Sequence, residues 1–250
     1  MHKYEETAIV IRQEEIADDI YSMWIRTENI AGEAKAGQFL SLYCNEGSRL
    51  LPRPISICEI DKKDKAIRLV YRVAGKGTEE FSALHTGSQV RVVGPLGNGF
   101  PKKELSAFLI GGGIGIPPML QLAKELNCEK KMILGFRNEL FLMDEFKKQG
   151  EVYVATEDGG VGTRGNVLDA IAENGLTADI IYACGPIPML RALKEYAKER
   201  GMECYISMEE RMACGIGACL ACVCQSTEKD AHSNVKNKRV CKEGPVFRAE

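Results

Sequence analysis

The stretch Ser106-Ala-Phe-Leu-Ile-Gly-Gly-Gly-Ile-Gly-Ile-Pro-Pro-Met-Leu120 joins an apolar run to a glycine turn and the start of a helix. The apolar run is typical of a buried parallel strand, and proline is tolerated in the first turn of a helix. Glycines at such a junction let backbone amides approach a pyrophosphate, and a helix N-terminus favours negative charge. The motif is not G-x-G-x-x-G, so an ordinary tight strand–helix turn stays open as an alternative.

A second turn of the same kind, Ala183-Cys-Gly-Pro-Ile-Pro-Met-Leu190, lies further along the chain. Strands and helices alternate from about residue 105, which is the pattern of a doubly wound α/β domain. If the two turns follow neighbouring strands, they flank one crevice at the carboxyl edge of the sheet. The remaining predicted strands are 131–136, 151–156 and 179–184, and the predicted helices are 117–126, 139–149, 165–174 and 186–200.

Residues 5–100 have a different rhythm, with short β-branched or alternating runs separated by glycines and charged turns. This spacing is typical of a β-barrel or sandwich. One short helix is expected, with Thr78 as its N-cap and Gly87 ending it. The predicted strands are 8–12, 20–25, 38–43, 67–73 and 89–93.

Two short motifs in this β region suggest a site that binds phosphate and a flavin ring. Arg53-Pro-Ile-Ser56 offers a guanidinium fork for phosphate and a small hydroxyl that can lie beside a flavin ring. Gly75-Lys-Gly-Thr78, just before the predicted helix, can form an anion-binding N-terminus. An ordinary glycine hairpin with a helix cap explains the second motif equally well.

The C-terminal part contains Cys214-Gly-Ile-Gly-Ala-Cys-Leu-Ala-Cys222 and a distal Cys241. C-x4-C-x2-C with a fourth cysteine is the spacing of a plant-type [2Fe–2S] site. A structural zinc site is the alternative, but it usually shows two CxxC-like knuckles. We interpret the extra Cys224 as a small buried hydrophobe, although it could substitute as a ligand. A ligand role for His232 is conceivable but not favoured.

Composition excludes several classes of function. The 250 residues are 45% hydrophobic, with a net charge of −2, which gives no case for nucleic acid or an acidic membrane. The start of the chain lacks the apolar run of a signal peptide, and no stretch is long enough to span a bilayer. Ten cysteines without such a signal favour a reducing cytoplasm. No motif for acid–base or nucleophilic catalysis is present, so no catalytic side chain is expected.

Taken in order, these motifs resemble the ferredoxin–NADP reductase superfamily. With the cysteine motif added, the chain resembles the electron-transfer subunits of NAD-dependent, class 1B dihydroorotate dehydrogenases. The resemblance covers the whole chain and implies a multi-domain β plus α/β fold. Its parts would be an FAD-binding β-barrel over 1–100, an NAD-binding doubly wound domain over 101–204 and a small [2Fe–2S] domain over 205–250.

The resemblance also implies site residues. Many relatives carry an aromatic residue where this chain has Ile55, which leaves the stacking partner of the flavin ring open, with Tyr71 as one candidate. Cys184 would lie near the nicotinamide ring, or serve only as a core thiol. FAD is assigned to Arg53, Pro54, Ile55, Ser56, Val70, Tyr71, Arg72, Gly77 and Thr78, NAD to Gly111, Gly112, Gly113, Gly115, Cys184, Gly185 and Pro186, and the cluster to Cys214, Cys219, Cys222 and Cys241.

The implied function is transfer of electrons from the FMN of a catalytic subunit through the cluster and FAD to NAD+. FAD is needed in the middle because nicotinamide accepts a hydride whereas the cluster passes single electrons. The expected partner is that FMN subunit, in a heterotetramer of two plus two, and the chain alone is not expected to oxidise dihydroorotate.

Three alternatives stay open. The chain could be the small subunit of a transhydrogenase or sulfide-dehydrogenase-like enzyme, although those relatives tend to have Asp where this chain has Cys214. A flavoprotein of sulfite reduction shares the fold, and a zinc-stabilised nucleotide-binding module is a non-enzymatic reading. NAD over NADP rests on the resemblance, because Arg137 could meet a 2′-phosphate or simply face solvent.

Overall fold

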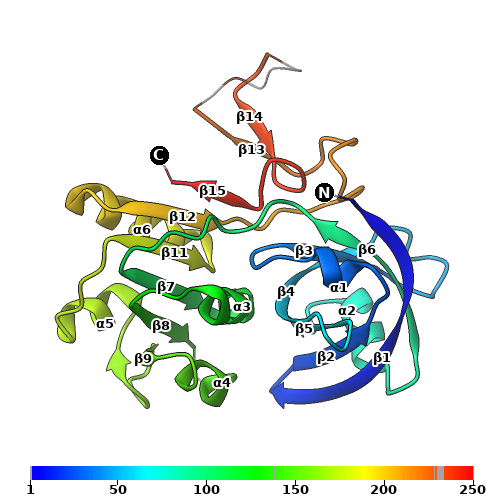
Figure 1. Cartoon of the computed structure of the whole chain (residues 1–250), viewed down its shortest axis with the longest axis horizontal. Coiled ribbons are helices and arrows are strands. Elements are labelled where there is room, and N and C mark those ends of the chain that lie inside the picture. The colour runs from blue at the N-terminus through cyan, green and yellow to red at the C-terminus, as the bar shows by residue number, and fades with distance from the viewer. Residues whose placement is uncertain (1, 138, 228, 230–233, 250) are drawn as a thin grey trace. The chain divides into compact units, whose positions relative to one another are not determined.

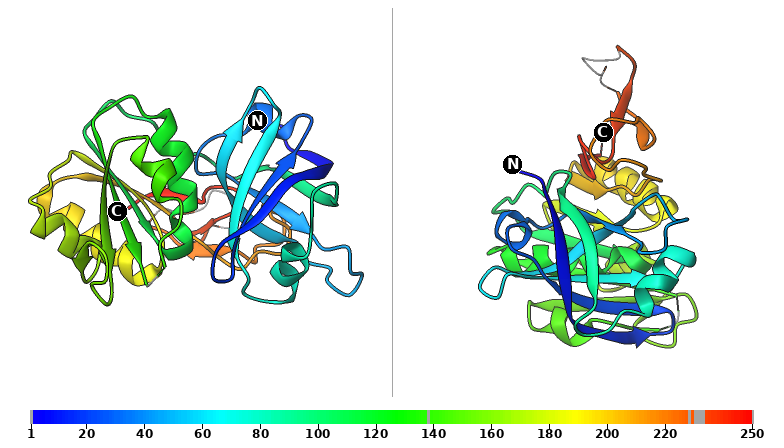
Figure 2. Two further views of the ribbon diagram at one scale, coloured as in Figure 1. Left: turned by 90° about the horizontal axis from the view of Figure 1, so that it is seen from below. Right: turned by 90° about the vertical axis from the view of Figure 1, so that its right-hand side faces the viewer.

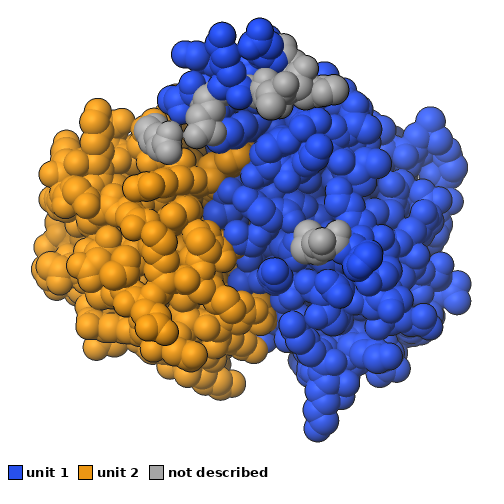
Figure 3. Space-filling view, turned by 45° about the horizontal axis from the view of Figure 1, so that its top comes forward, with its two compact units in different colours: residues 1–99, 208–246 blue, residues 100–207, 247–250 orange. Residues whose placement is uncertain are grey.

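The computed structural model describes residues 2–137, 139–227, 229 and 234–249, so His232 lies outside the described residues. The chain divides into two compact units, residues 1–99 with 208–246 and residues 100–207 with 247–250 (Figure 3). Each unit has its own sheet and its own hydrophobic core. No helix in the described part of the chain combines the length and apolar character that a bilayer crossing requires.

The first unit is built on a closed six-stranded barrel with the order β1-β2-β5-β4-β3-β6 (Figure 1). All neighbouring strands are antiparallel, and alternate side chains such as Leu40, Leu42 and Leu69 fill the interior. This confirms the predicted β-barrel. The elements are β1 (Tyr4–Ala17), β2 (Ile20–Arg26), α1 (Ile30–Glu33), β3 (Phe39–Tyr43), β4 (Arg53–Asp61), β5 (Ala66–Arg72), α2 (Lys76–Ser82) and β6 (Gln89–Leu96).

The short helix begins three residues earlier than the sequence predicts. Gly75 is the N-cap of α2, and the helix ends at Ser82, so neither Thr78 as N-cap nor Gly87 as terminus is correct. The Thr78 hydroxyl instead lies one turn inside and accepts the N–H groups of Ala74 at 2.9 Å and Gly75 at 3.2 Å. A threonine hydroxyl can accept these N–H groups from the third helical position as well as from the cap. A threonine in the sequence therefore does not fix the residue at which the helix begins.

Residues 208–246 belong to the same compact unit as the barrel. Their strands β13 (Val223–Gln225) and β14 (Asn237–Arg239) pair antiparallel and form a hairpin. Asn98, just after β6, fixes the end of this segment, because its side chain accepts from the N–H of Val246 at 2.9 Å and donates to the same residue's carbonyl at 2.8 Å.

The second unit contains the predicted α/β fold, a sheet in the order β10-β9-β8-β7-β11-β12-β15. Helices α5 and α6 pack on one face and share its apolar core, while α3 lies on the other face (Figure 2). The elements are β7 (Ala107–Gly112), η1 (Gly113–Gly115), α3 (Pro117–Glu125), β8 (Lys130–Phe136), α4 (Met143–Lys147), β9 (Glu151–Thr156), β10 (Thr163–Arg164), α5 (Val167–Glu173), β11 (Ile180–Cys184), α6 (Ile187–Arg200), β12 (Glu203–Ser207) and β15 (Val246–Arg248).

The predicted helix over 139–149 is wrong in its first turn. Leu142 adopts a left-handed backbone conformation with φ of 60°, so the helix cannot extend through it and α4 begins at Met143. The strand β12 was not predicted, because Glu203-Cys-Tyr-Ile-Ser207 is too short to show a clear period.

Candidate cofactor sites

The four cysteines of the C-terminal motif come from a loop and the end of a hairpin. Cys222 and Cys241 are buried, Cys214 is half-buried and Cys219 is exposed. The backbone ties the fourth cysteine to the third, since Val240 donates its N–H to the Cys222 carbonyl at 2.9 Å. Cys241 donates its N–H to the Cys222 sulfur at 3.4 Å. The fold therefore brings the distal Cys241 to the loop that carries the first three.

The loop directs its amides at sulfur. The Cys214 sulfur accepts from the N–H groups of Ala218 at 3.3 Å and Cys219 at 3.4 Å. Left-handed backbone angles at Gly215 and Gly217, with φ of 68° and 89°, make this turn possible. Burial raises the pKa of the Cys214 thiol, but N–H donors from Ile216, Cys219 and Ala218 outweigh it and lower that pKa to about 6. Cys214 is thereby held as the thiolate, which is the form that binds metal.

The pKa of the Cys241 thiol is shifted in the opposite direction, upward. Burial raises the pKa of its thiol, and the neighbouring Cys222 and Cys214 raise it further, to about 12. Without metal the Cys241 sulfur therefore keeps its proton, which a bound metal would have to displace. The donor set fits an iron–sulfur cluster in its chemistry: four cysteine sulfurs, amide donors to sulfur and mutual repulsion without metal.

The other candidate donors are less favourable. Cys224 lies half-buried on β13, opposite Lys238, and burial raises the pKa of its thiol, which favours the protonated form. Among all the described residues, the four cysteines included, no three or more His, Cys, Asp or Glu side chains are placed to hold a single metal ion.

Arg239 is a residue of this site that the sequence argument missed. Its Nη1 donates to the Gly217 carbonyl at 3.0 Å, and its Nε and Nη2 contact the Glu243 carboxylate at 3.1 and 2.5 Å. The Arg239 N–H also donates to Glu243 at 2.7 Å. These hydrogen bonds of Arg239 connect the cysteine loop to the segment that contains Cys241. An Arg followed by Glu four residues later is the signal that could have identified it.

The two predicted anion-binding motifs of the barrel lie together. A Cβ added at Gly77 would stand 2.3 Å from the Arg53 Nε and 2.8 Å from its Cζ, so the guanidinium lies directly on the first turn of α2. Arg53 also donates from Nη1 to the Leu51 carbonyl at 2.5 Å. A planar guanidinium beside a helix N-terminus suits a diphosphate, which is the group that FAD would place there.

Other residues assigned to FAD are distributed over both faces of the barrel wall. Ile55 packs against the barrel core, whereas Val70 is buried and Arg72 exposed on β5. Tyr71 is only 2% exposed, and its hydroxyl donates to the Gln13 amide oxygen at 3.4 Å. Its ring stacks on that of Tyr21 with 6.1 Å between centroids. This placement directs the Tyr71 ring into the core and does not favour stacking on a flavin.

We expect Arg53→Ala to weaken FAD binding by about tenfold to a hundredfold, because one charge-assisted hydrogen bond to phosphate contributes about 1.5–3 kcal/mol. The measurement is the FAD-to-protein ratio after gel filtration, with a dissociation constant from flavin fluorescence. Arg12→Ala is the matched control, since Arg12 is an exposed barrel arginine whose partner is Glu14. Equal FAD retention in both variants would remove Arg53 from the site.

In the second unit, the two glycine turns meet as the sequence predicted. Strands β7 and β11 are parallel neighbours, with Gly111 opposite Cys184. Strand β8 continues the sheet on one side and β12 on the other, so the strand order reverses between β7 and β11. Doubly wound folds bind nucleotides outside the carboxyl ends of strands at such a switch point.

Close packing explains most glycines at this point. A Cβ at Gly115 would stand 2.4 Å from the Cys184 carbonyl oxygen, and one at Gly112 would stand 2.7 Å from the Met189 sulfur. A Cβ at Gly185 would stand 2.5 Å from the Met189 methyl. Gly113 differs, because it has a left-handed φ of 54° and no atom within 4 Å of its missing Cβ. Gly113 thus leaves open space beside the turn, where a nucleotide can approach the backbone.

An acidic residue that the sequence argument did not place lies at the same edge. Strands β8 and β9 end in register at Phe136 and Thr156, and the next residues, Arg137 and Glu157, approach to 4.0 Å. Both side chains are mostly exposed, at 84% and 73%. A carboxylate at this edge suits the two hydroxyls of a ribose and repels a 2′-phosphate. The exposed Glu directly after a buried strand is the signal that could have identified it.

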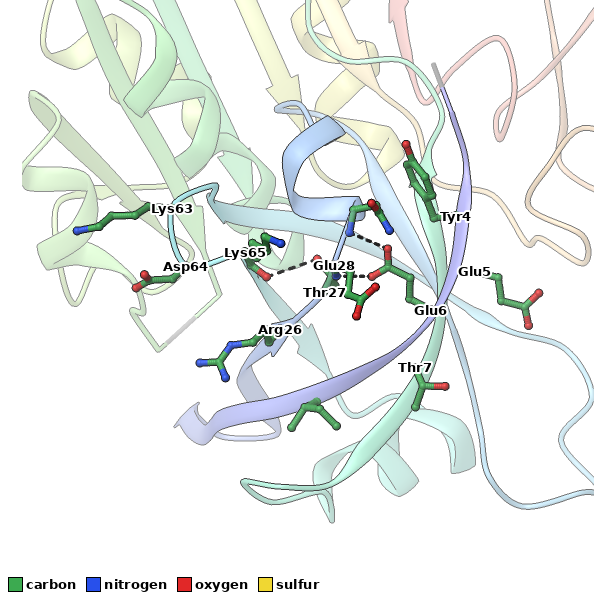
Figure 4. Close-up of a pocket in the computed structure, with 12 residues that line it drawn as sticks. Tyr4, Glu5, Glu6, Thr7, Arg26, Thr27, Glu28, Lys63, Asp64 and Lys65 are labelled. Atoms are coloured by element: carbon green, nitrogen blue, oxygen red, sulfur yellow. Dashed lines mark hydrogen bonds between the residues drawn. The ribbon is translucent and has the colours of Figure 1, made fainter.

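A separate pocket of about 620 Å³ lies on the barrel beside the start of β1 (Figure 4). It contains none of the predicted site residues. The Glu6 carboxylate at its centre accepts from the N–H groups of Glu28 at 2.7 Å, Asn29 at 2.8 Å and Ile30 at 3.3 Å. Glu6 therefore caps the start of α1, and we assign the pocket no function.

Comparison with known proteins gives consistent results. The model of the iron–sulfur cluster binding domain of dihydroorotate dehydrogenase B matches residues 209–250. A dihydroorotate dehydrogenase B (NAD(+)) electron transfer subunit from Fusobacterium nucleatum is 45% identical over 98% of this chain and 96% of its own length. The protein of the same name from Bacillus cereus is 43% identical over 97% of this chain and 96% of its own.

Solved structures share the fold. An NADH-dependent reduced ferredoxin–NADP oxidoreductase matches with a TM-score of 0.87 and 29% identity, covering 98% of this chain and 88% of that one. A cytochrome P450 reductase from Amycolatopsis matches with a TM-score of 0.68 and 22% identity, covering 80% and 67%.

Proposed function

The chain belongs to the family of electron transfer subunits of NAD-dependent dihydroorotate dehydrogenase B, and on that premise we propose how its residues perform this task. It is an oxidoreductase subunit of pyrimidine biosynthesis whose cofactors are FAD, a [2Fe–2S] cluster and NAD. The feature that carries the assignment is the four-cysteine site, in which the fold brings Cys241 to the loop of Cys214, Cys219 and Cys222.

When bound, FAD exchanges a hydride with NAD and single electrons with the cluster, which connects the two kinds of electron transfer. The chain's residues bind and orient. We assign the flavin diphosphate to Arg53 and the first turn of α2, and the side of its ring to Ser56. The backbone around Gly113 would receive the nicotinamide nucleotide, with Glu157 on a ribose. Two electrons from the cluster become a hydride only with one proton, which would come from solvent, so we assign no side chain as an acid or base.

We propose an FMN-containing catalytic subunit as the partner, in an assembly of two plus two. Support comes from exposed apolar side chains near the cysteines: on the loop Ile216 is 47% and Leu220 52% exposed, and at the start of β13 Val223 is 38% exposed. Exposed apolar side chains in one short segment are typical of a protein interface. An interface there would place the cluster next to the partner and shorten the path that an electron must cross.

We expect Leu220→Asp to weaken association with the catalytic subunit by about tenfold or more, because burying a charge at the centre of an interface costs at least 1–2 kcal/mol. Leu220 has a left-handed φ of 58°, which Asp adopts more readily than Leu, so the substitution does not strain the loop. Leu50→Asp, at a leucine that is 81% exposed in the loop between β3 and β4, is the control. Equal dissociation constants for both variants by calorimetry would place the interface elsewhere.

The transhydrogenase reading has less support. The solved oxidoreductase is 29% identical to this chain, whereas the dihydroorotate dehydrogenase B subunits are 43–45% identical over similar coverage. We propose that the protein is cytoplasmic because its sequence has ten cysteines, which in a reducing compartment serve as metal ligands or core thiols and not as disulfides.

Reconstitution tests the function. The purified chain alone should reduce an artificial acceptor with NADH but should not reduce NAD+ with dihydroorotate. Addition of an FMN-containing dihydroorotate dehydrogenase subunit should create that activity and saturate at a fixed ratio of the two chains. Dihydroorotate oxidation by the isolated chain, or no gain on adding the partner, would contradict the proposal.

A further inference from the structure

Ser41, in the middle of β3, has a buried hydroxyl without a partner. Its side chain is 1% exposed, and its oxygen forms no hydrogen bond with any residue that the structure describes. A buried polar group left unsatisfied costs about 1–3 kcal/mol, so native proteins rarely keep one without a function.

The strand directs this hydroxyl to the outside of the barrel. Its neighbours Leu40 and Leu42 fill the barrel core, and alternation places Ser41 on the opposite face. Ser41 pairs with Pro54 of β4. Two residues along each strand, and so on the same face, Phe39 pairs with Ser56. Residues opposite each other in an antiparallel pair share one face of the sheet. Ser41 therefore lies beside the strand to which we assign the flavin.

The cysteine loop covers the hydroxyl. A Cβ added at Gly215 would stand 2.8 Å from the Ser41 oxygen and 3.3 Å from the Leu96 Cδ1. Gly215 is buried, has a left-handed φ of 68° and directly follows Cys214. The Ser41 hydroxyl thus lies against the backbone next to the first cluster cysteine, where a side chain on residue 215 would exclude it.

We propose that Ser41 is a positioning residue of the cluster, whose hydroxyl donates a hydrogen bond to sulfur once the cluster is bound. The bond would satisfy the buried hydroxyl. It would also stabilise the reduced cluster, which carries more negative charge, and so raise its reduction potential. Because β3 pairs with the flavin strand, the same contact would fix the cysteine loop relative to that strand. The inference rests on the function proposed above.

The test compares Ser41→Ala with wild type in the loaded full chain, by a potentiometric titration followed by EPR. Removing the donor should make reduction of the cluster about tenfold less favourable, a shift of about 59 mV to lower potential for one electron. Iron content and FAD content should stay unchanged, because the four cysteines are intact and alanine fits the space of serine. The lost hydrogen bond should lower the melting temperature of the loaded chain by only about 2–4 °C. Ser48→Ala, at an exposed serine of the same unit, should change none of these values.

The other outcomes of this experiment each support or contradict the role of Ser41. An unchanged cluster potential, or a shift of the flavin potential alone, would overturn the role of Ser41. If Ser41→Ala loses iron, Ser41→Thr distinguishes the causes, because threonine keeps the hydroxyl. Iron retained in Ser41→Thr supports the hydrogen bond, whereas loss in both variants would make the position merely steric. A wild-type chain without iron would instead contradict the proposed function itself.

Discussion

Cys219→Ser is expected to yield a yellow protein that has lost its iron, from about two irons per chain to nearly none. Cys219 is exposed, so its replacement removes a ligand without opening a cavity in the core. The groups assigned to the flavin diphosphate, Arg53 and the first turn of α2, lie on other elements and contact each other directly. FAD should therefore remain bound while the iron–sulfur absorption and the EPR signal of the reduced cluster disappear.

Cys224→Ser is the matched control, at a cysteine five residues further along the chain. Cys224 lies on β13, outside the four cysteines that we assign to the cluster, so iron should stay at the wild-type level. Iron analysis and a flavin assay on the same samples give both results. Loss of FAD with iron retained in Cys219→Ser would show that the two sites have been assigned to the wrong parts of the chain.

Gly115→Ala is expected to destabilise the second unit by about 3 kcal/mol, because the new Cβ would meet the Cys184 carbonyl at 2.4 Å. The atoms nearest to this Cβ position all belong to the backbone of Cys184 and Gly185, so no flexible side chain can move away to make room. The two turns must then separate, which should lower the melting temperature by about 6–12 °C. Reduction of ferricyanide by NADH should show a KM for NADH at least about tenfold higher, since the turns flank the expected nucleotide position.

Gly113→Ala separates crowding from backbone conformation in the same turn. Nothing lies within 4 Å of the Cβ position, so only the left-handed φ of 54° opposes alanine. That conformation costs about 1–2 kcal/mol, and the loss of stability should be correspondingly smaller. Equal melting temperatures for the two variants would show that the approach of Gly115 to Cys184 does not hold the turns together.

The two main sheets of the fold could be predicted from the sequence. The barrel and the doubly wound sheet follow from periodicity and glycine placement, and the structure confirms them. The sequence leaves open whether the turns at Gly111 and Cys184 follow neighbouring strands, and the structure shows that they do. Errors arose where one residue changes the backbone, as Leu142 does at the start of α4 and Thr78 does inside α2. Such positions depend on single φ values and hydrogen bonds that no pattern of polarity contains.

Contacts between distant parts of the chain were beyond the sequence argument. Ser41 and Gly215 are far apart in sequence, and nothing in Phe39-Leu-Ser-Leu-Tyr43 distinguishes Ser41 from a solvent-facing strand residue. The bond of Arg239 to the Gly217 carbonyl likewise depends on how the hairpin folds back on the loop. The structure adds these supporting residues around cysteines that spacing alone identified.

The central claim is that this one chain carries electrons from its cluster through FAD to NAD+. The direct measurement is to reduce the chain fully with dithionite, remove the excess without oxygen and add NAD+ while following NADH absorbance and the cluster EPR signal. A flavin and a two-iron cluster together hold about three electrons, and NAD+ removes two of them as a hydride, so one NADH should form at once in each chain. The third electron leaves the cluster through the flavin and combines with that of a second chain, so prolonged incubation with excess NAD+ should bring the total to about 1.5 NADH per chain and abolish the cluster signal. A cluster that keeps its full signal throughout this incubation, with no NADH beyond one per chain, would contradict the account.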